Sequence, residues 1–236
     1  MVILFDWDDT MLDHGHASRI GAEVLFRHFA SSVSSSLQEF QAAWRVAQDT
    51  HFPRFARGEI SFVEHRVARM RHAFGDPEMD PELAVSRFEV YSKHYKENWR
   101  LFDDVMPCLD RLQGHPLGII TNGKLTEQSH KLERMGLAGR FSVVVISEEV
   151  GVGKPDPRVF LEACRRIGAQ PADCVYVGDD WHNDVVGSRA VGMTPVWLNR
   201  ENLPVPDPSV RVIQTLNDLS SAVVTKISSP VSEQAG

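Results

Sequence analysis

An apolar run leads directly into a cluster of acids at the start of the chain. Residues 2–5 are Val-Ile-Leu-Phe, and Asp6 and Asp8 follow with Trp7 between them. Such a run predicts a strand buried on both faces. In extended backbone Asp6 and Asp8 should point to the same side and Trp7 to the other. Two carboxylates about 4 Å apart repel by roughly 4 kcal/mol at an effective dielectric near 20. This cluster therefore needs a bound cation or a retained proton, unless the acids merely cap a helix.

Three further segments place polar side chains at the ends of apolar runs. They are Thr121-Asn122-Gly123, Lys154-Pro155-Asp156-Pro157, and Gly178-Asp179-Asp180 with Asp184 beyond it. Each has an ordinary explanation alone: a helix cap, a solvated loop or a simple turn. Ligands of an open α/β sheet, however, bind beyond the carboxyl ends of its strands. Four such segments at successive strand ends predict one shared site.

These residue types suit phosphoryl transfer. A carboxylate can serve as the nucleophile, and acids held against a cation match a phosphoryl group whose charge must be neutralised. Magnesium fits because it prefers oxygen ligands and keeps several waters. A second carboxyl group can act as general acid, which typically contributes about 10²–10⁴-fold in rate. A lysine and a hydroxyl can hold the remaining phosphoryl oxygens.

The elements that position these side chains alternate between strands and helices after residue 100. Apolar runs predict strands at 117–121, 143–146, 175–177 and 195–198, with a last one at 210–213. Helical patterns lie between them at 105–114, 126–135, 157–167 and 183–191, and a final helix is expected at 216–223. This alternation predicts an α/β fold with a doubly wound, mainly parallel, Rossmann-like sheet.

The stretch between the first and second strands is helical. A stripe through Phe40, Trp44 and Ala47 should stop before Pro53. Ser61 with Glu64 predicts a capping box, the following helix should end at Gly75, and Pro81 should open another that carries aromatic residues to Trp99. We therefore expect an α/β core of residues 1–13 plus 101–236, frayed over about 228–236, with a helical cap of residues 14–100.

Bulk composition narrows the class of protein. The chain has 236 residues, 42% of them apolar, and a net charge of −7, which argues against a general nucleic-acid surface. No apolar run reaches the roughly 18 residues of a membrane span, and no signal-peptide pattern is present. We expect a cytoplasmic location and no membrane partner. The three cysteines lack metal-type pairing and should be buried, reduced thiols.

The four segments resemble the four motifs of the haloacid dehalogenase (HAD) superfamily. The motifs are Asp6-Trp7-Asp8-Asp9-Thr10, the strand-terminal Thr121, the Lys154-Pro155-Asp156-Pro157 turn, and Gly178-Asp179-Asp180 with Asp184. The resemblance covers the chain apart from its tail, and the helical insert is similar to the type-1 cap of the phosphatase-rich subfamily. It implies a HAD-type phosphatase acting on a small phosphorylated substrate with Mg²⁺.

The resemblance also implies a role for each site residue. Asp6 would attack phosphorus to form an aspartyl-phosphate, while Asp8 would protonate the leaving group and then activate water. Asp6, the backbone carbonyl of Asp8, and Asp179 would bind magnesium. Thr121 and Lys154 would grip the phosphoryl group, helped by the backbone amides of Asn122 and Trp7, and Thr10 would fix the conformation around Asp8. Asp180 and Asp184 would orient the metal-bound waters or Lys154, or else cap a helix.

Other functions remain open at this stage. A phosphomutase resembling beta-phosphoglucomutase would use the same core. The dehalogenases lack the acid/base aspartate and need no metal, so Asp8 favours a phosphatase. Receiver modules draw their acids from different strands and have no long insert, and a complete catalytic set disfavours a non-catalytic binding module. Similarity to nucleotidase and sugar-phosphate phosphatase branches favours a nucleotide or sugar phosphate as substrate. Candidate selectivity residues are His14, His16, His51, Arg54 and Arg57; the sequence indicates no oligomeric state.

Overall fold

A computed structural model describes residues 1–219 and separates the chain into two units. One unit joins Met1–Leu12 to the chain from Leu101 onward, and the other is Asp13–Arg100. The expected fraying of 228–236 lies outside the described residues. Among residues 1–219, no helix is both long enough and apolar enough to cross a membrane.

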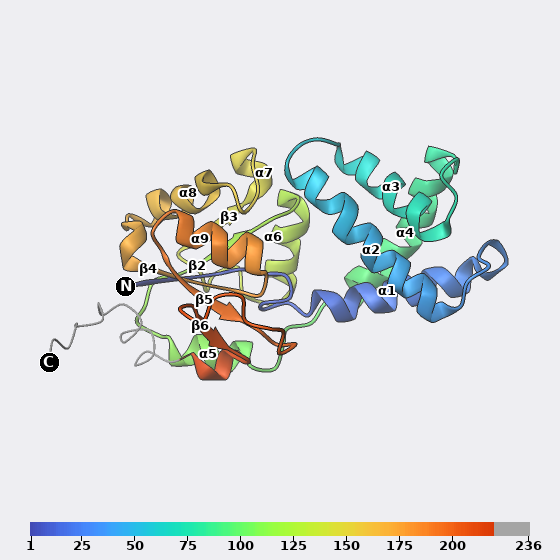
Figure 1. Cartoon of the computed structure of the whole chain (residues 1–236). Coiled ribbons are helices and arrows are strands. Elements are labelled where there is room, and N and C mark those ends of the chain that lie inside the picture. The colour runs from blue at the N-terminus through green and yellow to red at the C-terminus, as the bar shows by residue number, and fades with distance from the viewer. Residues whose placement is uncertain (220–236) are drawn as a thin grey trace, which may run out of the picture. The chain divides into compact units, whose positions relative to one another are not determined.

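The first unit is built on a parallel sheet (Figure 1). Within residues 1–219 its six strands lie in the order β3-β2-β1-β4-β5-β6, and every neighbouring pair is parallel. This confirms the predicted doubly wound α/β fold. The strands are β1 (Val2–Phe5), β2 (Leu117–Thr121), β3 (Val143–Ile146), β4 (Cys174–Gly178), β5 (Thr194–Leu198) and β6 (Arg211–Ile213).

Helices connect these strands and cover the sheet. The chain passes from β1 outward to β2 and β3, then crosses back to β4 and on to β5. Right-handed crossovers therefore place the helices before β2 and β3 on one face and those before β4 and β5 on the other. Figure 1 shows α8 and α9 side by side over the sheet. The helices of this unit are α5 (Val105–Arg111), α6 (Leu125–Arg134), α7 (Ser147–Val150), α8 (Pro157–Ile167) and α9 (Gly187–Ala190).

The central strands are buried on both faces, as their continuous apolar sequences require. Every residue of β1, β2 and β4 is buried. Burial of apolar surface stabilises by about 25 cal/mol per Å², so these strands anchor the unit. Cys108, Cys164 and Cys174 are free and buried, as predicted, and the sulfurs of the last two lie 3.8 Å apart.

The region after β4 differs from its predicted form. A single helix was expected over 183–191, but the chain forms a π-helical turn, η3 (Trp181–Val186), followed by the short α9. Asp180 caps this turn by accepting from Asn183 N at 2.7 Å. The start signal at Asp180 outweighed the helical pattern beyond it, so the turn begins earlier. The helix expected at 216–223 is a 3₁₀ turn, η4 (Leu216–Asp218), and its remainder lies outside the described residues.

The second unit is helical. Its helices are α1 (His14–His28), α2 (Leu37–Ala56), α3 (Phe62–Phe74) and α4 (Pro81–Glu97), with two shorter turns elsewhere in the chain, η1 (Ala30–Ser32) and η2 (Pro171–Asp173). The capping box of Ser61 and Glu64, the left-handed Gly75 and the opening Pro81 are confirmed. Trp99 lies beyond the end of α4, although it was expected on that helix.

The expected stop before Pro53 was wrong, because α2 continues to Ala56 with this proline inside it. Proline removes one backbone donor and is costly in the middle of a helix. Here it lies in the last turn, and Arg57 N still donates to Pro53 O at 3.0 Å. Only a short stretch of helix follows the proline, so the loss is local.

Candidate active site

Three carboxylates gather at the carboxyl edge of the sheet, on either side of the β1–β4 boundary. Oxygens of Asp6, Asp179 and Asp184 all lie within 4.8 Å of one another. Asp6 directly follows β1 and donates its N–H to Val177 O at 2.9 Å, which fixes its level against β4. The strand order reverses at this boundary, where doubly wound sheets bind their ligands.

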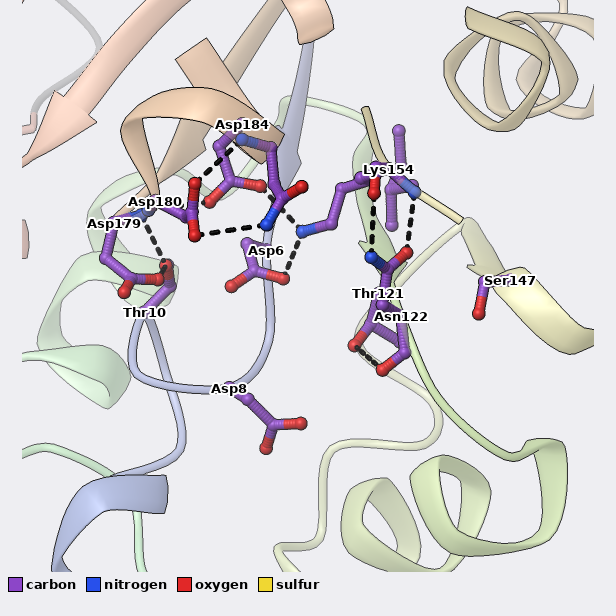
Figure 2. A network of polar contacts seen from close by, with 12 residues as sticks. Asp6, Asp8, Thr10, Thr121, Asn122, Ser147, Lys154, Asp179, Asp180 and Asp184 are labelled. Carbon is purple, nitrogen blue, oxygen red and sulfur yellow. Dashed lines mark hydrogen bonds and ion pairs between the residues drawn. The ribbon is translucent and has the colours of Figure 1, made fainter. Parts of the chain in front are cut away.

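Lys154 bridges this carboxylate cluster (Figure 2). Its Nζ donates to Asp6 Oδ1 at 2.5 Å and to Asp184 Oδ1 at 2.6 Å, and it also contacts Tyr176 Oη at 3.1 Å. The side chain is buried. Tyr176 was not predicted as a site residue: it lies in the middle of a strand, and no local motif marks it. The ammonium offsets part of the repulsion that was expected between the acids.

The charges of the cluster shift one another's protonation. Burial raises the pKa of Asp6 to about 7, opposed by Lys154 and reinforced by Asp179. Burial likewise raises the pKa of Asp184 to about 7. Burial, with the charge of Asp184 next, raises the pKa of Asp179 to about 8. Burial alone would lower the pKa of Lys154, but the charges of Asp184 and Asp6 hold it well above its usual value. The metal-free cluster thus tends to retain protons.

Local backbone makes room for these side chains. A Cβ at Gly178 would lie 2.3 Å from Asp184 Oδ2, so only glycine lets that carboxylate approach the end of β4. A Cβ at Gly153 would lie 2.8 Å from Asn122 Oδ1. That amide holds the next residue from both sides: Lys154 N donates to Asn122 Oδ1 at 2.7 Å, and Asn122 Nδ2 donates to Lys154 O at 3.0 Å.

Asp179 is held by neighbours on two sides. Thr10 Oγ1 donates to Asp179 Oδ1 at 2.9 Å and accepts from Asp179 N at 3.1 Å. Trp197 Nε1 donates to Asp179 O at 2.8 Å. Thr10 was expected to fix the backbone around Asp8, and its side chain instead bonds to Asp179.

The carboxylate of Asp8 lies apart from the cluster, as Figure 2 shows. Lys131 Nζ donates to its two oxygens at 2.7 and 2.9 Å, and Gln128 Nε2 donates to Oδ2 at 2.9 Å. Neither α6 residue was predicted as part of the site. The available signal was weak: a lysine and a glutamine on the buried side of a polar helix.

The remaining predicted residues fall around this arrangement. Thr121 ends β2 and its Oγ1 accepts from Gln128 Nε2 at 2.6 Å. The Trp7 side chain is fully buried, and its Nε1 has no hydrogen-bond partner within residues 1–219. The Asp180 side chain caps η3, one of the two roles considered for it, while its N–H donates to Asp184 Oδ2 at 3.0 Å. Asp184 therefore belongs to the carboxylate cluster itself.

The donor set fits a hard divalent cation. Carboxylate oxygens are the ligands that magnesium prefers. When all three acids of the cluster are ionised, Lys154 leaves two negative charges uncompensated, which matches the charge of one such ion. Asp6, Asp179 and Asp184 are the side chains placed to hold it.

A family model for haloacid dehalogenase-like hydrolases matches residues 1–192 of this chain. The match covers most of the 236 residues and contains all four motifs. The chain therefore belongs to the haloacid dehalogenase-like hydrolases, as the resemblance of its motifs predicted.

Individual relatives narrow this class. The chain is 42% identical over 201 residues to glyceraldehyde 3-phosphate phosphatase of Methanothermobacter thermautotrophicus, covering 84% of this chain and 85% of the relative. It is 32% identical over 243 residues to phosphoserine phosphatase of Thermus thermophilus, covering 89% and 94%. The HAD hydrolase YfnB from Bacillus subtilis, solved bound to magnesium, matches with a TM-score of 0.80 at 23% identity and covers 95% and 98% of the two chains. This last likeness confirms the fold.

Proposed function

We propose that the chain is a magnesium-dependent phosphatase that hydrolyses a small phosphomonoester through an aspartyl-phosphate on Asp6. The observation that carries this proposal is the position of Asp6 among two further carboxylates and the Lys154 ammonium. Relatives that act on glyceraldehyde 3-phosphate and phosphoserine support a small phosphate ester as substrate.

Each step of the reaction uses a group described above. Asp6 attacks phosphorus as the phosphorus–oxygen bond of the ester breaks, and Asp8 gives a proton to the departing oxygen. A water molecule then attacks the aspartyl-phosphate and passes a proton to Asp8, releasing phosphate and restoring Asp6. Lys154 and the Thr121 hydroxyl hold phosphoryl oxygens.

Magnesium would be held by Asp6, Asp179 and Asp184, with the Asp8 carbonyl as a further oxygen. When bound, it neutralises the charge of the phosphoryl group and of the surrounding carboxylates. Thr10 and Trp197 keep Asp179 oriented for this role through the hydrogen bonds given above.

The helical unit, Asp13–Arg100, acts in this proposal as a cap that selects the substrate. Of the candidate selectivity residues, Arg57 is exposed and pairs with Glu59 at 2.6 Å, which is the geometry of a surface turn. His14 Nδ1 lies 2.8 Å from Tyr95 Oη. A nucleotide or sugar phosphate stays our expectation for the substrate, alongside the hydroxyacid and triose phosphates of the relatives.

The test is phosphate release from a panel of phosphomonoesters that includes phosphoserine, glyceraldehyde 3-phosphate, a nucleoside monophosphate and hexose phosphates. We expect turnover with magnesium, none with excess EDTA, and none from Asp6→Asn. Turnover that persists in EDTA or in this variant would contradict the proposal. Release of an isomeric sugar phosphate without free phosphate would indicate a mutase instead.

A further inference from the structure

Helix α6 places two polar side chains against the Asp8 carboxylate. Gln128 and Lys131 are three residues apart and so share one face of the helix. Both are buried, with Lys131 only 2% exposed. Lys131 Nζ reaches both Asp8 oxygens, at 2.7 and 2.9 Å, and Glu127 lies farther away, at 3.8 Å. The main ionic contact of this lysine is therefore with Asp8.

Gln128 links Asp8 to the end of β2. Its Nε2 donates to Asp8 Oδ2 at 2.9 Å, to Thr121 Oγ1 at 2.6 Å and to Asn122 O at 3.1 Å. Within residues 1–219 its Oε1 is buried and has no hydrogen-bond partner. Turning the amide over would set Oε1 against a carboxylate and a carbonyl oxygen, both acceptors. The amide is thus fixed with its nitrogen toward the site.

This contact also sets the direction of the Thr121 hydroxyl. Its oxygen accepts from Gln128, so its own proton remains to be donated. The backbone acceptor beside it, Asn122 O, is 3.5 Å away, at the limit of a hydrogen bond. A phosphoryl oxygen that reaches Thr121 would therefore meet a hydroxyl already turned to donate.

A buried lysine at this position is costly for the fold. Removing an ammonium from water carries an effective penalty of several kcal/mol, which a carboxylate partner only partly offsets. An apolar residue would fill the same space without that penalty. What the lysine adds is a fixed position for Asp8: without it, the carboxylate would be free to turn between solvent and the side chains around it.

We propose that Lys131 and Gln128 are positioning residues that hold the Asp8 carboxylate on the leaving-group side of the site, apart from Asp6, Asp179 and Asp184. This inference rests on the proposed function of Asp8 as the proton donor. When the ester bond breaks, the departing oxygen takes the proton of Asp8. A misplaced Asp8 slows this step most for a poorly acidic leaving group, because such a group cannot depart as the free anion.

The test is the first turnover of a series of aryl phosphates whose leaving phenols span about three pKa units, measured by rapid mixing as release of the phenol. Lys131→Met and Gln128→Leu remove the two contacts separately. In both we expect a steeper dependence of log rate on leaving-group pKa. The loss should reach about 10- to 100-fold for the least acidic phenol and stay below about threefold for the most acidic, since general acid catalysis typically contributes 10²–10⁴-fold. Lys131→Arg, which keeps a cation, should restore part of the shallow dependence.

Two reference variants make the outcome decisive. Glu133→Gln, on the exposed side of α6, should match the parent in rate and slope. Asp8→Asn should give the steepest slope. If Asp8→Asn keeps the parent slope, Asp8 is not the proton donor and the proposed function fails at that residue. If Asp8→Asn steepens the slope while both folded α6 variants lose rate equally across the series, the positioning role is overturned. Circular dichroism and thermal denaturation establish which variants are folded.

Discussion

Lys154 reaches the carboxylate cluster because one amide side chain holds its backbone on both sides. Asn122 accepts from Lys154 N and donates to Lys154 O, and the absence of a side chain at Gly153 lets the amide approach. A lysine has many rotamers, and fixing one of them costs up to about 2 kcal/mol of entropy. The clamp limits this cost by fixing the point from which the side chain starts.

Asn122→Ala should therefore impair Lys154 without touching it. Two hydrogen bonds of about 0.5–1.5 kcal/mol each are lost, and we expect kcat/KM to fall at least about tenfold with a lower melting temperature. Steady-state kinetics and thermal denaturation measure both. Asn217→Ala, at an exposed position, is the matched control. Unchanged kinetics in Asn122→Ala would show that the loop holds Lys154 without this clamp.

Gly178→Ala tests the approach of Asp184 to the end of β4. The added methyl would lie 2.3 Å from Asp184 Oδ2, so the carboxylate must move. We expect a loss of about 1–3 kcal/mol in the free energy of unfolding and a higher magnesium requirement for activity. Gly139→Ala, where a Cβ meets nothing within 4 Å, should change stability by less than about 0.5 kcal/mol. A Gly178→Ala protein as stable as this control would contradict the steric argument.

The sequence reveals the acids and hydroxyls that directly follow strands, because a strand end fixes the direction in which the next side chain leaves the sheet. Asp6, Thr121 and Asp179 were found in this way. Asp184 was only an uncertain candidate, since the π-helical turn that aims it cannot be read from local pattern. Gln128 and Lys131 were missed because their contacts with Asp8 span more than a hundred residues.

At the scale of an element, α3 carries a histidine whose surroundings disfavour its charge. His65 is buried, and neither ring nitrogen has a hydrogen-bond partner within residues 1–219. Burial lowers its pKa from 6.5 to about 3, and the nearby charges of Arg69, His51 and Arg66 lower it further. The rings of Phe52, Phe55 and Phe62 surround it.

This histidine should make stability depend on pH. Between its folded and unfolded pKa values the unfolded chain binds more protons, so stability is fully present above about pH 6.5 and declines as the pH falls toward 3. One group contributes a slope of at most about 1.4 kcal/mol per pH unit. Urea unfolding from pH 5 to 8 should show a flatter profile for His65→Phe than for the parent. The exposed His28→Gln should keep the parent profile. A His65→Phe profile parallel to that of the parent would mean that other groups set the dependence.

Element boundaries followed from the sequence wherever a cap residue or a continuous apolar run marked them. Strands β2 and β3 and helix α8 occupy their predicted residues, because burial on both faces and a proline at the first helical position leave little freedom. Helix α2 outran its predicted stop, since a proline in a last turn removes little. The short α7 was not predicted, because four residues carry no periodicity.

At the scale of the whole chain, one ion pair joins four segments of the first unit. Arg200, after β5, donates to both oxygens of Asp104 at 2.8 and 3.0 Å and to Thr10 O at 2.9 Å. Asp104 also accepts from Thr215 Oγ1 at 2.7 Å and from Leu216 N at 2.9 Å. The pair thus ties the loop after β1 and the segment before α5 to the far end of the sheet. No sequence pattern indicates it, because no two of these segments are neighbours in the chain.

Breaking this pair should cost more than an exposed ion pair would. The side chain of Asp104 is only 9% exposed, and removing one partner of a buried pair typically costs about 3–5 kcal/mol because the other charge is left unpaired. We therefore expect Arg200→Met to lower the free energy of unfolding by about 3 kcal/mol in urea. Asp104→Asn in the same background should add little, because its charge partner is already gone, and the double-mutant cycle should return a coupling above about 1 kcal/mol. Additive losses would show that the two residues stabilise the unit independently. Because Arg200 also holds Thr10, and Thr10 holds Asp179, Arg200→Met should raise the magnesium concentration needed for half-maximal activity, whereas Arg165→Met, at an exposed pair on α8, should leave both quantities unchanged.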